Sequence, residues 1–164
     1  MNGVAGDAAS TSVLGGALRR HALDVVDVLD GLESPGRSGS RAGGPDQLAE
    51  ERELLASAAA QLDRIGARLQ AWSTDAVERT SRRRGLDEVA ARDGLLLDGR
   101  RVVEVPGPSR VEPTTRLQSR DRLQDLLNRL TSSDAKSLAG LARELESSTA
   151  ALARLAERAR ARPR

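Results

Sequence analysis

Cysteine, phenylalanine and tyrosine are absent from this chain of 164 residues, and tryptophan, histidine and methionine each occur once. Without cysteine, disulfide bonds and thiolate metal sites are excluded. Because tryptophan is the only aromatic residue and occurs once, a core must be built from leucine, alanine and valine. Such a core suits close helix packing better than a ligand pocket lined by aromatic residues. The first residues contain no basic or apolar segment and no long apolar run follows, so we expect no Sec-type signal peptide and no membrane span.

The formal net charge is only +2, but the charges are unevenly distributed. Residues 1–34 carry 5 acidic and 2 basic side chains, and residues 46–80 carry 7 acidic and 4 basic ones. Residues 81–120 and 121–164 each carry 6 acidic and 9 basic side chains. This pattern predicts either attraction between the two halves of one helix bundle or, as the alternative, a basic surface for an acidic partner.

The most regular pattern lies between residues 46 and 79. Apolar residues recur there at alternating spacings of three and four, through positions 55, 58, 62, 65, 69, 72 and 76. That spacing places one narrow line along a helix, whereas strand side chains alternate every two residues. A helix of roughly 34 residues is about 50 Å long, and it needs other helices to cover its apolar line.

The sequence on either side of this long helix predicts one further helix before it and a pair of short strands after it. We expect a first helix over residues 12–32, joined to the long helix by a Gly-, Pro- and Ser-rich connector, as in an antiparallel hairpin. The long helix should reach Arg84, with Gly85 as a candidate C-cap, and two further turns should end at Asp93-Gly94. The Asp98-Gly99 pair, between two apolar runs, predicts a β-hairpin turn.

We therefore expect an all-α fold of antiparallel helical hairpins or a coiled-coil bundle, with a small β-hairpin insertion. The C-terminal part should contain two helices, 115–130 and 134–162, separated by Thr131-Ser132-Ser133, whose hydroxyls suit an N-cap. The expected organisation is a disordered N-terminus (1–11), a helical hairpin (12–93), the β-hairpin (94–106), a linker (107–114) and a C-terminal helical hairpin with a basic tail (115–164).

The apolar line predicts an interaction seam rather than a catalytic site. Trp72 lies on it and is predicted to be buried inside the bundle or, as the alternative, to anchor a partner helix. The C-terminal residues repeat the seven-residue spacing. The predicted seam consists of Leu48, Leu55, Leu62, Ile65, Leu69, Trp72, Leu138, Leu145 and Leu152.

Arginines form a candidate basic patch that could neutralise phosphates. Base-stacking aromatic residues are missing, no nucleic-acid-reading motif is present and acidic residues are interspersed, so the sequence argues against a nucleic-acid partner. The patch consists of Arg82, Arg83, Arg84, Arg158, Arg160 and Arg162.

No residue set indicates catalysis or a cofactor. His21 is the only histidine, and it lies beside apolar residues with no cysteine or tyrosine to act as its nucleophile. Together with Asp24 it would offer too few ligands for a metal ion. Helix bundles that bind two metal ions carry Glu-x-x-His motifs on facing helices, and this sequence contains no such motif. We expect no enzyme activity, cofactor or metal site.

Three stretches resemble the WXG-motif helical-hairpin proteins of actinobacteria that are associated with type VII (ESX-like) secretion. They are Leu14-Gly-Gly-Ala-Leu-Arg-Arg, Leu62-Asp-Arg-Ile-Gly-Ala-Arg-Leu-Gln and Arg92-Asp-Gly-Leu-Leu-Leu-Asp-Gly-Arg-Arg-Val, within residues 10–105. The chain differs in having no Trp-x-Gly between its first two helices, because Trp72 is followed by Ser73-Thr74. It also lacks the tyrosine of the family's export signal.

The resemblance implies a non-enzymatic protein that forms homodimeric or heterodimeric helix bundles with itself or with a helical-hairpin relative. Its expected location is the cytoplasm, or outside the cell after export without a Sec signal. The alternative is a cytoplasmic coiled-coil adaptor whose basic C-terminal half binds an acidic partner or nucleic acid.

Overall fold

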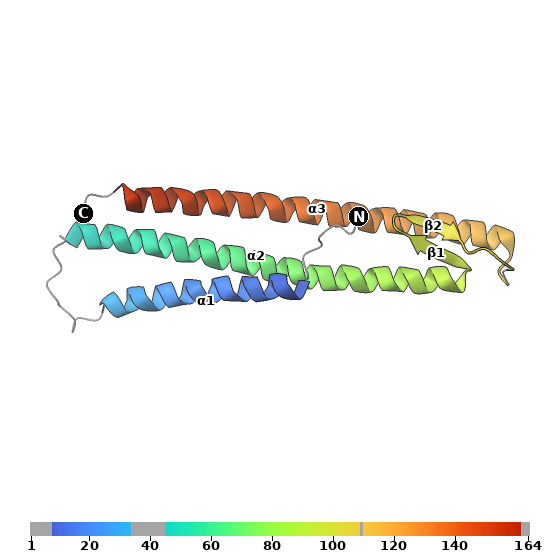
Figure 1. Ribbon diagram of the computed structural model, residues 1–164, viewed down its shortest axis with the longest axis horizontal. Helices are drawn as coiled ribbons and strands as arrows, with labels where there is room; N and C mark the ends of the chain where they lie inside the picture. Colours follow the sequence, from blue (N-terminus) through green and yellow to red (C-terminus); the bar gives the residue numbers. More distant parts are fainter. Residues whose placement is uncertain (1–7, 34–44, 109, 162–164) are drawn as a thin grey trace. The chain divides into compact units, whose positions relative to one another are not determined.

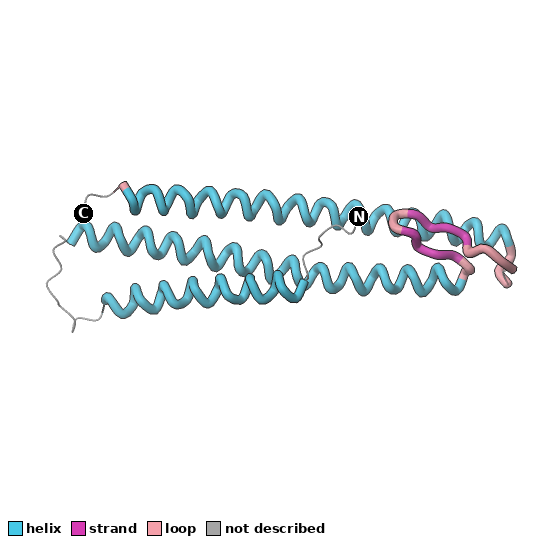
Figure 2. Tube along the Cα trace, in the orientation of Figure 1, coloured by secondary structure: helices cyan, strands magenta, loops and turns pink. Residues whose placement is uncertain are grey.

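The computed structural model describes residues 8–33, 45–108 and 110–161. These residues form three helices and one β-hairpin (Figure 1, Figure 2). In chain order the elements are α1 (Ala8–Glu33), α2 (Pro45–Arg92), β1 (Leu95–Asp98), β2 (Arg101–Glu104) and α3 (Pro113–Arg160). The expected all-α fold with a small β-hairpin is confirmed.

The chain divides into two compact units. Unit 1 contains the described residues up to Ser73 and those from Leu141 onwards, and unit 2 runs from Thr74 to Gly140. Both borders fall inside helices, α2 at one and α3 at the other. The sequence had instead placed its domain borders at connectors.

In unit 1, α1 and α2 form the predicted antiparallel hairpin. At one end the Ser73 hydroxyl donates to the Ala8 carbonyl at 2.6 Å. At the other end the Arg52 guanidinium donates to the Leu29 carbonyl at 3.5 Å. The start of α1 thus lies beside Ser73 and its end beside Arg52, so the two helices run antiparallel.

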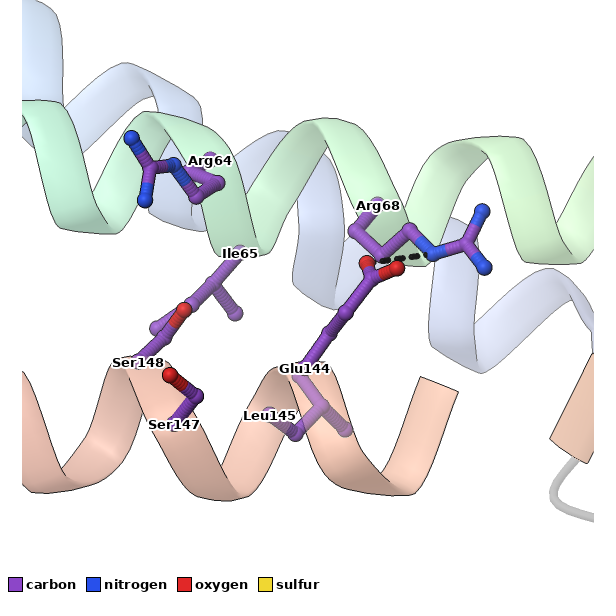
Figure 3. A pocket seen from close by; sticks show the side chains of 7 residues that line it. All are labelled: Arg64, Ile65, Arg68, Glu144, Leu145, Ser147 and Ser148. Atoms are coloured by element: carbon purple, nitrogen blue, oxygen red, sulfur yellow. Dashed lines mark ion pairs between the residues drawn. The ribbon is translucent and has the colours of Figure 1, made fainter. Parts of the chain in front are cut away.

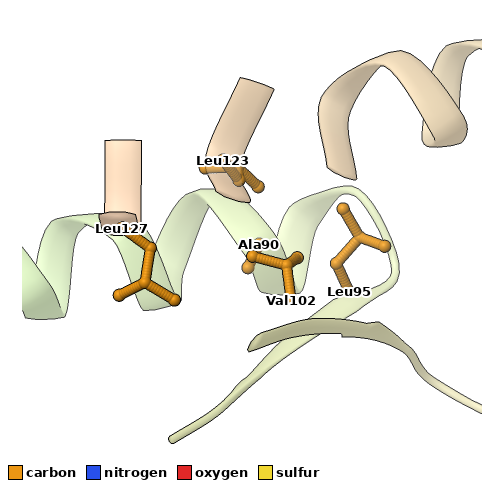
Figure 4. Close-up of a cluster of buried hydrophobic side chains, with 5 residues drawn as sticks. All are labelled: Ala90, Leu95, Val102, Leu123 and Leu127. Atoms are coloured by element: carbon orange, nitrogen blue, oxygen red, sulfur yellow. The ribbon is translucent and has the colours of Figure 1, made fainter. Parts of the chain in front are cut away.

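Unit 2 has a core of large aliphatic side chains around the β-hairpin. Leu95 of β1 and Val102 of β2 pack with Ala90 of α2 and with Leu123 and Leu127 of α3 (Figure 4). Leu95 and Leu127 are fully buried. The hairpin is therefore covered by helices, which an isolated two-stranded sheet needs for stability.

The strands pair antiparallel, with Leu97 opposite Val102 and Asp98 opposite Arg101. The two turn residues are consequently Gly99 and Arg100, one position later than predicted. Gly99 has φ +59°, and no non-glycine residue of the described chain has positive φ. A two-residue turn with its glycine first matches the type II′ preference of hairpins, which explains the shift.

The start of α1 differs from its predicted position, and of the two ends considered for α2 the structure uses the later one, at Asp93-Gly94. α1 begins at Ala8, so residues 8–11, expected to be disordered, are helical; alanine at positions 8 and 9 favours helix. Residues 1–7 lie outside the described part. α2 continues through Gly85, where a helix end was a candidate. The helix stops instead before Gly94, whose φ of +70° suits a residue just past a helix end.

The predicted C-terminal helical hairpin is wrong, because α3 is one helix of 48 residues. The Thr131 hydroxyl donates to the Leu127 carbonyl at 2.8 Å, one turn back, and so is satisfied within the helix. No proline or glycine interrupts the backbone there. α3 also begins two residues earlier than expected, with Pro113 first and Glu112 capping the Thr115 N–H at 3.1 Å.

Candidate interaction surface

One line of small residues on α1 faces α2. Gly15 and Ala22 are buried, and they lie seven residues apart on α1. A Cβ added to Gly66 of α2 would lie 2.5 Å from the Gly15 carbonyl oxygen and 2.5 Å from Arg19 Cγ. The two backbones therefore approach so closely that only glycine fits at the crossing.

Polar contacts fix the register of the two helices beside this crossing. Arg19 Nε donates to Asp63 Oδ1 at 2.9 Å, and Arg19 Nη1 donates to Gln70 Oε1 at 3.1 Å. The Arg19 and Asp63 side chains are about half exposed, 49% and 53%. Such a surface pair contributes little stability, about 0–1 kcal/mol, so its main effect is alignment.

A second line on α1 remains open to solvent. Three residues of this second line directly precede residues of the line that faces α2. They are Leu14 before Gly15, His21 before Ala22 and Val28 before Leu29. One residue is about 100° around a helix, so this second line lies beside the α2 contact rather than in it. We name it the α1 stripe, and its members are Leu14, Leu18, His21, Val25 and Val28.

The exposures of the α1 stripe show that the described residues leave it largely uncovered. Leu14 is 54% exposed and Val28 is 59% exposed. The His21 side chain is 72% exposed, whereas Leu18 and Val25 are half-buried. The spacing of four, three, four and three is the coiled-coil repeat, so these side chains form one continuous apolar edge with His21 at its centre.

His21 contacts Asp24 one turn later, with 3.7 Å between Nδ1 and Oδ2. Within the described ranges, no three His, Asp or Glu side chains are grouped closely enough to hold a metal ion. The pair therefore behaves as a surface contact of α1. Its position in the middle of an apolar edge is the unusual feature, since histidine weakens apolar packing there.

The predicted interaction seam is covered only in part. Leu69 is buried, and half-buried residues make up most of the remainder: Leu62, Ile65, Trp72, Leu145 and Leu152. Leu48, Leu55 and Leu138 are exposed, so the described residues do not cover this part of the predicted seam. Leu138 also belongs to unit 2, whereas the other seam residues belong to unit 1.

Sequence reasoning missed four buried residues of α2 in unit 1. They are Leu54, Ala59, Gly66 and Ser73, none of which lies on the predicted line. The cause is that α2 contacts two helices there. It meets α1 through Gly66 and Ser73, and it meets α3 through Arg68, whose Nε lies 2.6 Å from Glu144 Oε2. Two contacts bury a face wider than one coiled-coil line.

A small cavity of about 140 Å³ lies beside this ion pair. Figure 3 shows Ile65 and Arg68 on α2 facing Glu144, Leu145 and Ser148 on α3. Its volume is below the roughly 300–1,000 Å³ of small-molecule sites. The lining offers two serine hydroxyls and no histidine to activate them, so nucleophilic chemistry is not supported.

The basic residues divide between the two units. In unit 2, Arg82 pairs with Glu78 at 2.5 Å, Arg83 donates to the Gly99 carbonyl at 2.8 Å, and Arg84 is exposed. In unit 1, Arg158 and Arg160 are exposed, and no ion pair joins either of them to another described residue. Arg162 lies outside the described residues. Of the three patch arginines in unit 2, Arg82 and Arg83 are thus engaged within that unit.

No protein-family model, characterised protein or solved structure matches this chain. None of the described helices is long and apolar enough to cross a membrane.

Proposed function

We propose that this chain is a non-enzymatic helical interaction protein that binds a protein partner through the α1 stripe. The observation that carries the proposal is the exposure of Leu14 and Val28 at coiled-coil spacing on a helix that is already anchored to α2. Scattered exposed apolar side chains need no explanation, but a continuous apolar edge marks an interaction site. An amphipathic helix of a partner is the natural occupant of such an edge.

The resemblance to WXG-motif helical hairpins supports the same mode of action. It adds the proposal that the protein is associated with type VII secretion and pairs with itself or with a helical-hairpin relative. The antiparallel α1–α2 hairpin is consistent with this. Detection in culture medium only when the secretion ATPase is present would support export, and retention in the cytoplasm in both cases would contradict it.

Site-specific photo-crosslinking in the cells that make the protein tests the interaction. A photo-reactive phenylalanine analogue replaces Leu14, and in a matched control it replaces Leu23. Leu23 is 62% exposed on the same helix but lies outside the α1 stripe. We expect a discrete protein adduct from position 14 and none from position 23. No adduct from position 14 would contradict the proposal, and the adduct's mass identifies a second copy or another protein.

A second candidate function rests on Arg158 and Arg160. Their exposure, without an ion pair to any described residue, suits an acidic protein surface or a nucleic-acid backbone. This is the adaptor function predicted as the alternative. Binding of DNA that weakens steeply with added salt would support it, because phosphate contacts release counterions. Failure to bind at low ionic strength would exclude a nucleic-acid partner.

A further inference from the structure

We infer that the cavity between α2 and α3 in unit 1 is a binding site for a small tetrahedral oxyanion, the phosphate group. This site is separate from the α1 stripe and does not depend on the proposed function. The inference rests on a buried hydroxyl without a partner, on the donor groups around the cavity and on the charges of its lining.

Ser148 brings an unsatisfied hydroxyl to this cavity. The residue is 6% exposed and lines the cavity, and no hydrogen bond joins its hydroxyl to another residue of the described chain. Other hydroxyls on α2 and α3 are satisfied one turn back: Thr149 donates to the Leu145 carbonyl at 2.7 Å, and Thr80 and Thr131 do the same. Figure 3 shows the Ser148 side chain pointing from α3 towards α2. A buried hydroxyl in this position needs an acceptor from within the cavity.

The position of Ser148 in the sequence is unusual for a polar residue. Leucines recur along α3 at spacings of three and four, and Ser148 takes the place between Leu145 and Leu152. A leucine or alanine would continue the apolar line there. A buried serine instead adds a polar group that helix packing does not need and that is costly to bury without a partner.

The remaining donors lie where the cavity opens to solvent. Arg64 and Ser147 are exposed, and both line the cavity together with the buried Ser148. No hydrogen bond or ion pair joins Arg64 to another described residue, so its guanidinium is available to a ligand. A guanidinium can donate to two oxygens of one phosphate, and serine hydroxyls can donate to the others. An anion with several acceptor oxygens therefore suits this set of donors.

The charges of the lining favour an anion over a cation. Glu144 is the only carboxylate among the lining residues, and its Oε2 lies 2.6 Å from Arg68 Nε. This ion pair neutralises both side chains, so Arg64 gives the lining a net positive charge. A cation would be repelled by Arg64 and would find no uncommitted carboxylate to bind it.

The size of the cavity suits a phosphate group. Its volume is about 140 Å³, and one water occupies about 30 Å³ of the liquid. There is thus room for a few waters or for one phosphate, with Ile65 and Leu145 as the apolar part of the wall. Water would satisfy Ser148 but would leave Arg64 without a counter-charge. Phosphate satisfies both groups.

An NMR titration of the whole chain with inorganic phosphate, at constant ionic strength, tests this site. We expect saturable shifts of the Ser147 and Ser148 amide signals. Arg64→Gln and Ser148→Ala should each weaken binding about fivefold or more, because each removes a donor to the anion. Arg154→Gln is the matched control, since Arg154 is exposed on α3 outside the cavity, and it should change the affinity less than about twofold.

Thermal unfolding separates a ligand-binding hydroxyl from a structural one. Without phosphate, Ser148→Ala should keep or raise the Tm, because it removes a buried hydroxyl that has no partner in the described chain. Saturating phosphate should raise the Tm of the natural chain more than that of Ser148→Ala. A lower Tm of Ser148→Ala without phosphate would show that the hydroxyl has a structural partner, and it would overturn the inference.

Comparison with other anions identifies the bound group. Acetate or chloride that shifts the same signals with the affinity of phosphate would overturn a phosphate site. So would the absence of saturable shifts with phosphate, which would leave water as the occupant. Glycerol phosphate distinguishes two sources of the group. Binding that also depends on Arg64 assigns the site to the phosphate of a larger molecule, and binding of inorganic phosphate alone assigns it to the free ion.

Discussion

The buried side chains of unit 2 are large, whereas those of unit 1 are mostly small. Leu95, Leu123 and Leu127 close around the β-hairpin in unit 2. In unit 1 the contact of α1 with α2 depends on Gly15 and Gly66, which let the backbones touch. Both units also expose large aliphatic side chains, for example Leu96 (55%) and Leu138 (57%) in unit 2. A contact through glycines leaves the larger side chains of α1, such as Leu14 and Val28, on the outside.

The two units therefore differ in how their helices pack, through large side chains in unit 2 and through glycines at the α1–α2 crossing in unit 1. Unit 2 folds its hairpin onto two helices, and the Gln124 side chain bonds to the backbone of Val102 in β2 and of Arg100 in the turn. Unit 1 buries one line of α1 and exposes the next. Three substitutions and one pH titration test the packing of these units, and they are given from the largest expected effect to the smallest.

Leu127→Ala should have the largest effect, a loss of about 3–4 kcal/mol from the stability of unit 2. The side chain is fully buried, and shortening it leaves a cavity between α3 and the hairpin. Its neighbour Leu126, 39% exposed, is the matched control and should cost under about 1 kcal/mol when changed to alanine. Urea denaturation measures both, and equal losses would contradict a packed core in unit 2.

Gly66→Ala should lower the stability of unit 1 by about 2 kcal/mol. The added methyl group meets the Gly15 carbonyl oxygen, which cannot move without displacing α1. Gly85→Ala is the matched control: it lies within α2 with open space around it, and it should gain up to about 1 kcal/mol from helix propensity. Hydrogen exchange of α1 amides reports the local effect. Unchanged exchange in Gly66→Ala would contradict the close crossing.

Gln124→Ala should cost about 1–2 kcal/mol in unit 2. The carboxamide accepts from the Val102 N–H at 2.8 Å and donates to the Arg100 carbonyl at 2.9 Å, so its removal leaves both backbone groups of the hairpin without this partner. Faster exchange of the Val102 amide is the specific readout. Gln118→Ala, at an exposed position of α3, should leave that rate unchanged.

The smallest expected effect concerns pH at the start of α3. The Thr114 hydroxyl, followed by the Thr115 and Thr114 N–H groups, lowers the pKa of Glu112 from 4.5 to about 2. Because the folded pKa is the lower one, the stabilisation from this cap is present above pH 4.5 and is lost as the pH falls towards 2. NMR titration of the Glu112 carboxyl should show it, and Thr114→Ala should raise its pKa. A wild-type midpoint near 4.5 would contradict the cap.

Local sequence signals predicted the elements of this fold well. The spacing of apolar residues indicated the α1–α2 hairpin, and the Asp98-Gly99 pair indicated the β-hairpin within one residue. The turn of the β-hairpin and the apolar spacing of each helix depend on residues close in sequence. The break expected at Thr131-Ser132-Ser133 failed because hydroxyl groups that can cap a helix can also bond back to it, as Thr131 does.

The candidate surface was harder to predict because it depends on which line of a helix is covered. The sequence identified the apolar line of α2, but the number of helices that α2 contacts is set by tertiary packing. As a result Ala59 and Gly66 were missed as buried residues. The α1 stripe was visible as apolar residues on the first helix, but only the contact of Gly15 with Gly66 shows which line of α1 is occupied.

The positions of the unit borders have a practical consequence for dissecting the molecule. Ser73 and Thr74 are consecutive residues of α2, and Gly140 and Leu141 are consecutive residues of α3. Truncation or proteolysis at either border therefore severs a helix and creates unsatisfied backbone ends where there were none. Cutting the chain in the connectors between helices keeps α2 and α3 whole. Because each of these helices belongs to both units, every such fragment carries part of the other unit. Engineered fragments of this chain will need new caps at positions 73 and 141.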